Sequence, residues 1–269
     1  MIGRFFWRNW RACATAAASL VAVDAQAGAW TLEEDATQLF LQVEYFEADT
    51  GFDANGDPAN GTYRKLNGAF STEYGLFDWL TIGSKAEARQ TEIDSDGQDA
   101  KTYGPAEGGV WARVRFWRGA ATVASAQIGY TDASAYDERL RPSLGDGASE
   151  IDMRGLIGHG FGAEWGDGWL NAEAAYRLRF EDAADQIRLD LTAGFRPAAA
   201  PRLLLMAQSF GTYAAGNGTR SDYDVLKLSP SVGFEITPSV TVQIGVSREV
   251  MGRDIEEGQA VFSSLWWTF

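Results

Sequence analysis

The chain has 269 residues, a formal net charge of −14 and a mean hydropathy of −0.22. This acidity argues against nucleic acid as a partner, because its phosphates would be repelled. The single cysteine, Cys13, leaves the rest of the chain with no disulfide framework and no thiolate metal site.

The first 27 residues have the organisation of a secretory signal peptide. An arginine-rich start precedes a short apolar run and a small-residue cleavage motif: Arg4, Arg8 and Arg11, then 12–23, then Ala25-Gln26-Ala27. The run is shorter than the roughly 20 apolar residues that a membrane-spanning helix needs. We therefore expect a signal peptide over 1–27 and one domain over 28–269. Removing three arginines and Asp24 from 23 basic and 37 acidic residues leaves 20 and 36, a net charge of −16.

Beyond residue 36, apolar and polar side chains alternate with the period of two that is typical of strands. In one such stretch, Ile187, Leu189 and Leu191 alternate with Arg188 and Asp190. Most stretches reach the length of about 9–11 residues that a tilted membrane strand requires. Twelve strands are predicted, at 37–48, 63–75, 79–92, 108–117, 120–131, 150–161, 168–180, 186–196, 202–212, 223–236, 240–250 and 259–269.

Two of these strands depart from simple alternation. The ninth begins Leu203-Leu204-Leu205-Met206, where both faces are apolar. The tenth contains Pro230, which cannot donate a hydrogen bond to a neighbouring strand. We therefore predict a bulge at Pro230.

The connections alternate between short turns and longer polar loops. Short turns are predicted at 76–78, 117–119, 197–201 and 237–239, and longer loops at 49–62, 93–107, 131–149 and 212–222. Outer-membrane barrels have this asymmetry, with the short turns in the periplasm. An even number of strands would place both termini there. Aromatic residues near the two ends predict two interfacial girdles: Phe77, Trp79, Phe116, Trp165, Trp169 and Phe195, and Tyr45, Tyr63, Tyr103, Tyr130, Tyr213 and Tyr223.

The chain ends in Leu265-Trp266-Trp267-Thr268-Phe269. An alternating strand with Trp267 and a terminal Phe269 resembles the insertion signal of bacterial outer-membrane barrels, which implies recognition by the barrel assembly machinery. A secreted β-sandwich would also alternate, but its strands would be nearer five or six residues. The predicted fold is therefore all-β, a transmembrane antiparallel up-and-down barrel of about 12 strands in a Gram-negative outer membrane.

The predicted register places many charged side chains inside the barrel. One interpretation is a polar conduit whose basic strip selects anions. The other is a cross-strand network that fills and stiffens a narrow lumen, and both stay open. The residues are Lys85, Glu87, Arg89, Arg113, Arg115, Arg154, Glu173, Arg177, Arg179, Arg188, Asp190 and Arg196, accompanied by Glu44 and Asp152. The longest loop, 131–149, is the only candidate to fold inward as a plug.

Two acidic segments resemble pieces of a calcium loop: Asp53-Ala54-Asn55-Gly56-Asp57 and Asp94-Ser95-Asp96-Gly97-Gln98-Asp99. Neither continues to the required glutamate, and clusters of Asp, Asn and Gly are ordinary loop residues. We expect no specific metal site. An acidic rim that meets divalent cations bridging lipopolysaccharide is the better hypothesis.

The only histidine, His159, bears on enzymatic activity. Twelve-stranded phospholipases are similar in size and use a His-x-Ser pair at the outer leaflet, whereas this chain has His159-Gly160-Phe161. Omptin-type proteases need acidic and His–Asp pairs at the outer rim, and His159 is expected near the periplasmic end. A general base must lie within hydrogen-bond reach of its nucleophile. We therefore expect no enzymatic activity and a structural role for His159.

Two weak resemblances concern biological context. Residues 69–83, read as strand, turn and strand, resemble small proteobacterial barrels, including those of aromatic-degradation operons. Residues 150–160 and 203–210 resemble outer-membrane proteins of Xag-type biofilm exopolysaccharide loci. These motifs are structural and imply no functional residue.

The sequence thus predicts a passive pore or export component for small polar or saccharide solutes, with no cofactor. The alternatives are a closed structural or adhesive barrel linked to the cell surface or a biofilm, and a lipid-modifying barrel enzyme, which the missing His–Ser pair disfavours. Expected partners are outer-membrane lipid, lipopolysaccharide, the barrel assembly machinery, and a small polar solute or exopolysaccharide.

Overall fold

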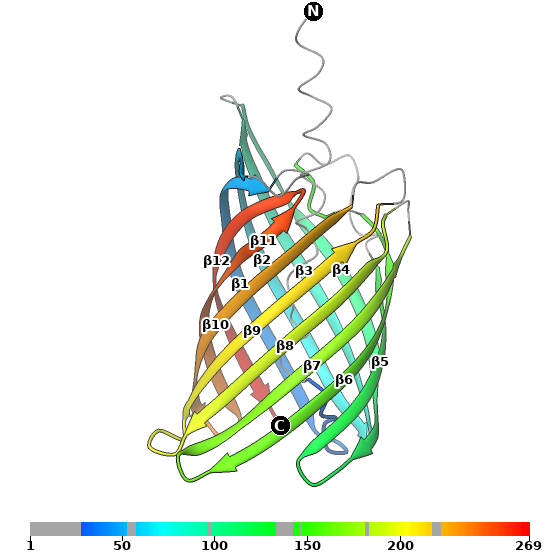
Figure 1. Cartoon of the computed structure of the whole chain (residues 1–269), viewed down its shortest axis with the longest axis vertical. Helices are drawn as coiled ribbons and strands as arrows, with labels where there is room; N and C mark the ends of the chain where they lie inside the picture. Colours follow the sequence, from blue (N-terminus) through cyan, green and yellow to red (C-terminus); the bar gives the residue numbers. More distant parts are fainter. Residues whose placement is uncertain are drawn as a thin grey trace, which may run out of the picture.

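Twelve antiparallel strands close into a barrel in which each strand pairs with its sequence neighbours and β1 pairs with β12 (Figure 1). The structure, a computed structural model, describes residues 28–52, 58–95, 98–132, 142–145, 147–180, 183–216 and 222–269. The strands are β1 (Thr37–Phe52), β2 (Pro58–Phe77), β3 (Leu80–Ser95), β4 (Gln98–Arg118), β5 (Thr122–Asp132), β6 (Glu150–Ala163), β7 (Gly166–Arg179), β8 (Gln186–Pro197), β9 (Leu203–Ala214), β10 (Tyr223–Thr237), β11 (Val240–Arg253) and β12 (Ile255–Thr268). The predicted twelve-stranded up-and-down barrel is confirmed.

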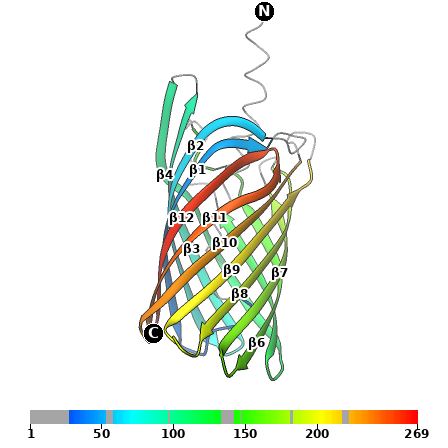
Figure 2. The same ribbon diagram turned by 60° about the vertical axis from the view of Figure 1, so that its left-hand side comes forward.

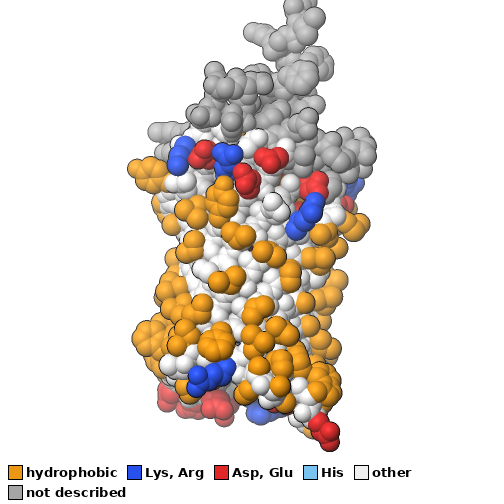
Figure 3. All heavy atoms as spheres, turned by 90° about the vertical axis from the view of Figure 1, so that its left-hand side faces the viewer, with side chains coloured by type: hydrophobic (Ala, Val, Ile, Leu, Met, Phe, Trp, Pro, Cys, Tyr) orange, Lys and Arg blue, Asp and Glu red, His pale blue; other side chains and the backbone are white. Residues whose placement is uncertain are grey.

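The alternating polar and apolar residues of the sequence lie alternately on the inner and the outer face of the barrel wall. On β6, Asp152 and Arg154 are buried, whereas Met153 and Ile157 are about half exposed, at 45% and 52%. Successive side chains on a strand point to opposite faces, so the charged set lines the inside and the apolar set the outside. Figure 3 shows hydrophobic side chains spread over the outer wall, with charged side chains gathered toward its two ends.

We call the two ends of the barrel the turn end and the loop end. The turn end carries the connections that follow the even-numbered strands and the C-terminal residue Phe269, and the loop end carries the connections that follow the odd-numbered strands. No helix in the described part of the chain is long and apolar enough to cross a membrane. The predicted signal peptide, 1–27, the whole calcium-like segment 53–57, and residues 96 and 97 of the second such segment lie outside the described residues.

Two of the predicted loops are wrong, because much of 49–62 and 93–107 is strand. β1 extends to Phe52, β2 begins at Pro58, and β3 and β4 are separated only by residues 96 and 97. The β3–β4 hairpin projects beyond the neighbouring strands (Figure 2). Its polar composition is typical of loops, but cross-strand pairs such as Thr91 opposite Thr102 and Glu92 opposite Lys101 hold it in register. Lys101 Nζ and Glu92 Oε2 are 3.6 Å apart.

The predicted bulge at Pro230 is also wrong. Pro230 pairs with Ala207 in unbroken register on the β9 side. On the β11 side, the same register joins Leu228 to Arg248 and Ser231 to Gly245, and the register shifts lie instead between Leu226 and Lys227 and between Glu235 and Thr237. The proline is exposed on the outer face, and its missing donor leaves the register of the ladder unchanged.

Three residues assigned to the aromatic girdles point into the barrel. Tyr63 and Tyr223 are buried, and Tyr63 packs edge-on against Phe46 with ring centroids 6.0 Å apart. Trp169 lines a cavity at the turn end. Aromatic rings suit both a membrane interface and a lumen. Their position near a strand end therefore did not distinguish outward-facing from inward-facing rings.

Candidate functional site

Most of the twelve charged side chains that the sequence predicted inside the barrel are buried there. Nine of the twelve are buried: Glu87, Arg89, Arg113, Arg154, Glu173, Arg177, Arg179, Arg188 and Asp190. Lys85, Arg115 and Arg196 are partly exposed.

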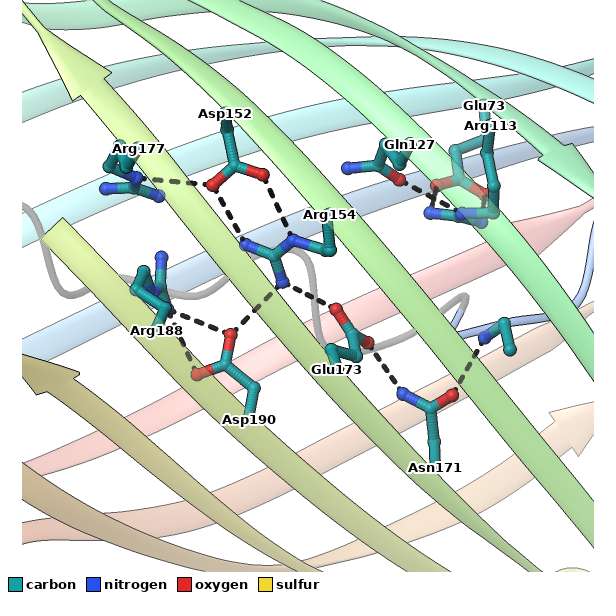
Figure 4. A network of polar contacts seen from close by, with 11 residues as sticks. Glu73, Arg113, Gln127, Asp152, Arg154, Asn171, Glu173, Arg177, Arg188 and Asp190 are labelled. Atoms are coloured by element: carbon teal, nitrogen blue, oxygen red, sulfur yellow. Dashed lines mark hydrogen bonds and ion pairs between the residues drawn. The ribbon is translucent and has the colours of Figure 1, made fainter.

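The largest group of these charges lies on β6, β7 and β8, with Arg154 at its centre (Figure 4). Its Nη1 donates to Glu173 Oε2 at 2.5 Å and to Asp190 Oδ2 at 3.1 Å. Its Nε donates to Asp152 Oδ1 at 3.2 Å. One guanidinium therefore contacts carboxylates from three adjacent strands.

Two further arginines complete this network. Arg177 Nε donates to Asp152 Oδ2 at 3.3 Å, and Arg188 Nη2 lies 3.2 Å from Asp190 Oδ2. A buried charge is costly unless it is paired and hydrogen-bonded. Here each carboxylate contacts at least one guanidinium along the wall.

A second group lies on β2, β3 and β4. Arg113 Nη2 donates to Glu73 Oε1 at 3.0 Å, and its Nε donates to Gln127 Oε1 on β5 at 3.0 Å. Arg89 Nη2 donates to Glu87 Oε2 at 3.1 Å. We call the inward charged residues of both groups the charged arc; they are Glu73, Glu87, Arg89, Arg113, Asp152, Arg154, Glu173, Arg177, Arg188 and Asp190.

The remaining wall, on β9–β12, has a different chemistry toward the turn end, whereas nearer the loop end it carries the buried charges Lys227 and Glu249. Gln243 Nε2 donates to Ser231 Oγ at 2.6 Å, Ser264 Oγ donates to Gln243 Oε1 at 2.7 Å, and Trp266 Nε1 donates to Ser264 Oγ at 2.9 Å. Apolar side chains such as Leu204 accompany this chain of neutral hydrogen bonds. We call Leu204, Met206, Gln208, Ser229, Ser231, Gln243, Phe262 and Ser264 the neutral arc, on β9–β12.

The N-terminal segment, residues 28–36, enters the lumen from the turn end. The Ala29 N–H donates to Asn171 Oδ1 at 2.8 Å, and the Ala29 carbonyl accepts from Ser125 Oγ. Arg113 Nη1 donates to the Trp30 carbonyl at 3.3 Å. Asn171 Nδ2 in turn donates to Glu173 Oε1, so the segment is joined to the charged network.

From there the segment crosses to the β2–β3 turn. Thr31 Oγ1 donates to the Asp78 carbonyl at 2.6 Å, and the Leu32 N–H donates to Thr81 Oγ1 at 2.8 Å. Its path from β7 to β2 therefore occupies the charged side of the mouth. This segment has no strand periodicity, so nothing in its sequence indicated that it enters the lumen.

A second segment reaches the lumen from the loop end. The side chain of Arg89 donates to the carbonyl of Leu144, which is almost fully buried. Leu144 belongs to the connection 131–149, which was predicted as the only candidate to fold inward. The described part of that connection does fold inward. The prediction that no other segment would is wrong, since residues 28–36 also enter the lumen.

At the turn end a cavity of about 430 Å³ remains beside the N-terminal segment. Gly28 and Trp30 of that segment line it together with residues of β1, β7, β8 and β10–β12. Its walls combine indole rings with charged and amide side chains, including Trp169, Trp266, Asn171, Arg196 and Glu235.

His159 lies outside this lumen. It is exposed on the outer wall near the turn end, and its Nδ1 is 2.8 Å from Thr122 Oγ1 on the neighbouring strand. Within the described residues, no group of three or more His, Cys, Asp or Glu side chains could hold a metal ion.

The proposed insertion signal lies at the seam of the barrel. Phe269 and Trp267 are exposed outward with their ring centroids 5.4 Å apart. The backbone of Phe269 exchanges two hydrogen bonds with Thr37, of 2.7 and 2.9 Å. The C-terminal residue therefore helps to close β12 against β1.

Comparisons with known proteins place this barrel among outer-membrane proteins by fold. No protein-family model matches the sequence, and no curated protein matches it significantly. An outer membrane channel from Pseudomonas putida F1 is similar with a TM-score of 0.68 and 15% identity, over 89% of this chain and 97% of that one. The KdgM porin in complex with disordered oligogalacturonate gives 0.51 and 6%, over 86% and 99%. The translocator domain of the autotransporter NalP from Neisseria meningitidis gives 0.52 and 12%, over 88% and 90%.

These similarities confirm the fold of a small outer-membrane barrel. The proteins that share it are described as a channel, a porin and the translocator domain of an autotransporter, so the fold by itself identifies no solute. The resemblance to Xag-type proteins stays a prediction.

Proposed function

We propose that this protein is a passive outer-membrane pore for small polar or saccharide solutes. The observation that carries the proposal is the division of the inner wall into a charged arc and a neutral arc. The ion pairs described above for the charged arc join side chains on strands at most two apart, such as Arg113 with Glu73 and Arg154 with Asp190. These pairs therefore run along the inner wall of the barrel.

The two arcs suit a hydroxylated solute. The neutral arc offers hydroxyl and amide groups that both donate and accept, as Gln243, Ser231 and Ser264 do among themselves. The charged arc offers oriented guanidinium and carboxylate groups whose mutual pairing limits net attraction for either ion. Weak contacts of this kind allow a solute to enter and to leave.

The P. putida channel and the KdgM porin support this proposal, since proteins of the same fold serve as channels. The turn end would face the periplasm, with both termini there after cleavage before Gly28. The acidic loop end would meet lipopolysaccharide, and the C-terminal strand would be recognised by the barrel assembly machinery. We propose no enzymatic activity and no cofactor.

The test is single-channel current from the purified, refolded protein in a planar bilayer. Discrete conductance steps that saccharides interrupt in a concentration-dependent way are the expected result. A correctly folded, heat-modifiable barrel that gives no current would overturn the proposal and favour the closed structural or adhesive barrel. Cleavage before Gly28 is checked independently by the intact mass of protein isolated from membranes.

A further inference from the structure

The cavity at the turn end has the composition of a ligand site. Its volume of about 430 Å³ falls within the range of about 300–1,000 Å³ that is usual for ligand pockets. Three indoles line it, Trp30, Trp169 and Trp266, and they come from the N-terminal segment, β7 and β12. The cavity is therefore assembled from elements that are distant in sequence.

Two of these indoles lie against glycines of the inner wall. A Cβ atom at Gly194 would come within 2.2 Å of the Trp169 ring, and one at Gly158 within 2.5 Å of the Trp30 ring. Each ring therefore occupies the space that any other residue would fill. Trp266 is held differently, edge-on to Phe40 with ring centroids 6.1 Å apart. All three indoles are only partly buried.

The polar lining is arranged around one ion pair. Arg196 Nη1 donates to Glu235 Oε2 at 3.2 Å, and the two side chains remain about one third exposed, at 31% and 30%. Asn171 is fixed by the Ala29 N–H and by Glu173. The cavity therefore presents donors and acceptors side by side, next to flat apolar surfaces.

This combination favours a neutral ligand with many hydroxyl groups. Glu235 opposes an anion at Arg196, and Arg196 opposes a cation at Glu235. A wholly apolar ligand would remove water from the ion pair and supply no hydrogen bonds in return. A sugar ring has an apolar C–H face for an indole, and its hydroxyl groups can both donate and accept.

We propose that this cavity is a binding site for a neutral saccharide unit at the turn end of the pore. Trp169 and Trp266 provide the stacking surfaces, and Arg196, Glu235 and Asn171 contact the hydroxyls. The proposal names the solute class of the pore, and so rests on the proposed function. The N-terminal segment contributes Trp30 and thereby forms one wall of the site.

The test is calorimetric titration of the full barrel with maltotriose and galactose, in a detergent without a sugar headgroup. Sodium benzoate and choline serve as aromatic and cationic probes. We expect saturable binding of a neutral saccharide that Trp169→Ala and Trp266→Ala each weaken by about 10-fold, the loss of one aromatic contact. The matched control, Trp165→Ala, removes an exposed indole outside the cavity and should bind as the wild type does.

A second variant separates the site from general damage. Gly194→Ala keeps all three indoles but forces the Trp169 ring off the wall, and it should also weaken binding while the barrel stays heat-modifiable. Absence of saturable saccharide binding, saturation by benzoate or choline alone, or equal affinity in the Trp169 and Trp165 variants would each overturn the proposal.

Binding and conduction are scored separately. Current without saccharide binding would contradict the proposed binding site and leave the proposed pore function standing. Saccharide binding without current would support the proposed binding site and contradict the proposed pore function. Loss of both would remove both conclusions.

Discussion

The charged arc and the neutral arc belong to one sheet, yet they stabilise it by different means. The charged arc buries guanidinium and carboxylate groups whose desolvation is offset only while every partner is present. The neutral arc relies on hydroxyl and amide hydrogen bonds together with apolar side chains, such as Leu204, that need no partner. A single substitution should therefore lower the free energy of unfolding more in the charged arc than in the neutral arc.

The largest expected effect is that of Arg154→Ala. It would leave Asp152, Glu173 and Asp190 without their shared guanidinium, in a place where the Arg154 side chain is only 1% exposed. Breaking a buried ion pair in this way costs about 3–5 kcal/mol. The measurement is the free energy of unfolding by denaturant in lipid vesicles. A loss no larger than that of a neutral-arc variant would contradict the distinction between the arcs.

The next effect concerns conduction. Deleting residues 29–33 from protein refolded without 1–27 removes the part of the N-terminal segment that crosses the charged side of the mouth. The opening widens, so single-channel conductance should rise, roughly two-fold. Glu33→Gln, which changes only an exposed side chain of this segment, is the control. Unchanged conductance in the deletion would mean that the constriction lies elsewhere.

Ion preference provides a smaller and more specific effect. Glu73→Gln leaves the Arg113 guanidinium without its carboxylate partner, so the reversal potential in a salt gradient should shift toward anion preference. Thr241→Val, which lies inward on β11 without a charge, should not shift it. A shift toward cations in the Glu73 variant, or an equal shift in both, would show that the charged arc does not set the selectivity.

The smallest effect is expected in the neutral arc. Ser231→Ala removes the acceptor of one hydrogen bond from Gln243 and should lower the free energy of unfolding by about 1 kcal/mol. The same denaturant titration measures it. If this loss approached that of Arg154→Ala, the neutral arc would be as dependent on its network as the charged arc.

The strands and their faces could be predicted because the membrane imposes a period of two on the wall. Asp152 and Arg154 were assigned inward because Met153 and Ile151 alternate with them, and the structure buries both charged residues. The same logic failed for Trp169 and Tyr223, since an aromatic residue suits either face. It failed for Ile93 and Thr102 because loop-like composition concealed their pairing across the β3–β4 hairpin.

The site was less predictable than the wall. The Ala29 N–H meets Asn171 across a separation of 142 residues, and no local pattern encodes that contact. A glycine inside a strand ordinarily weakens it, whereas Gly158 and Gly194 make room for the rings of Trp30 and Trp169. Glycine opposite an aromatic residue is the one signal that could have indicated an inward ring.

The seam between β1 and β12 has a consequence for the order of folding. Leu41 pairs with Leu265 there, so the sheet cannot become a cylinder until the last strand has been delivered. The N-terminal segment, by contrast, needs only β2 to β7 for its contacts with Asp78, Ser125 and Asn171. We therefore expect these early residues to be seated while the sheet is still open. Assembly would then begin with the contacts of the N-terminal segment and finish with the pairing of β1 and β12. A chain that lacks the N-terminal segment should therefore close its barrel more slowly.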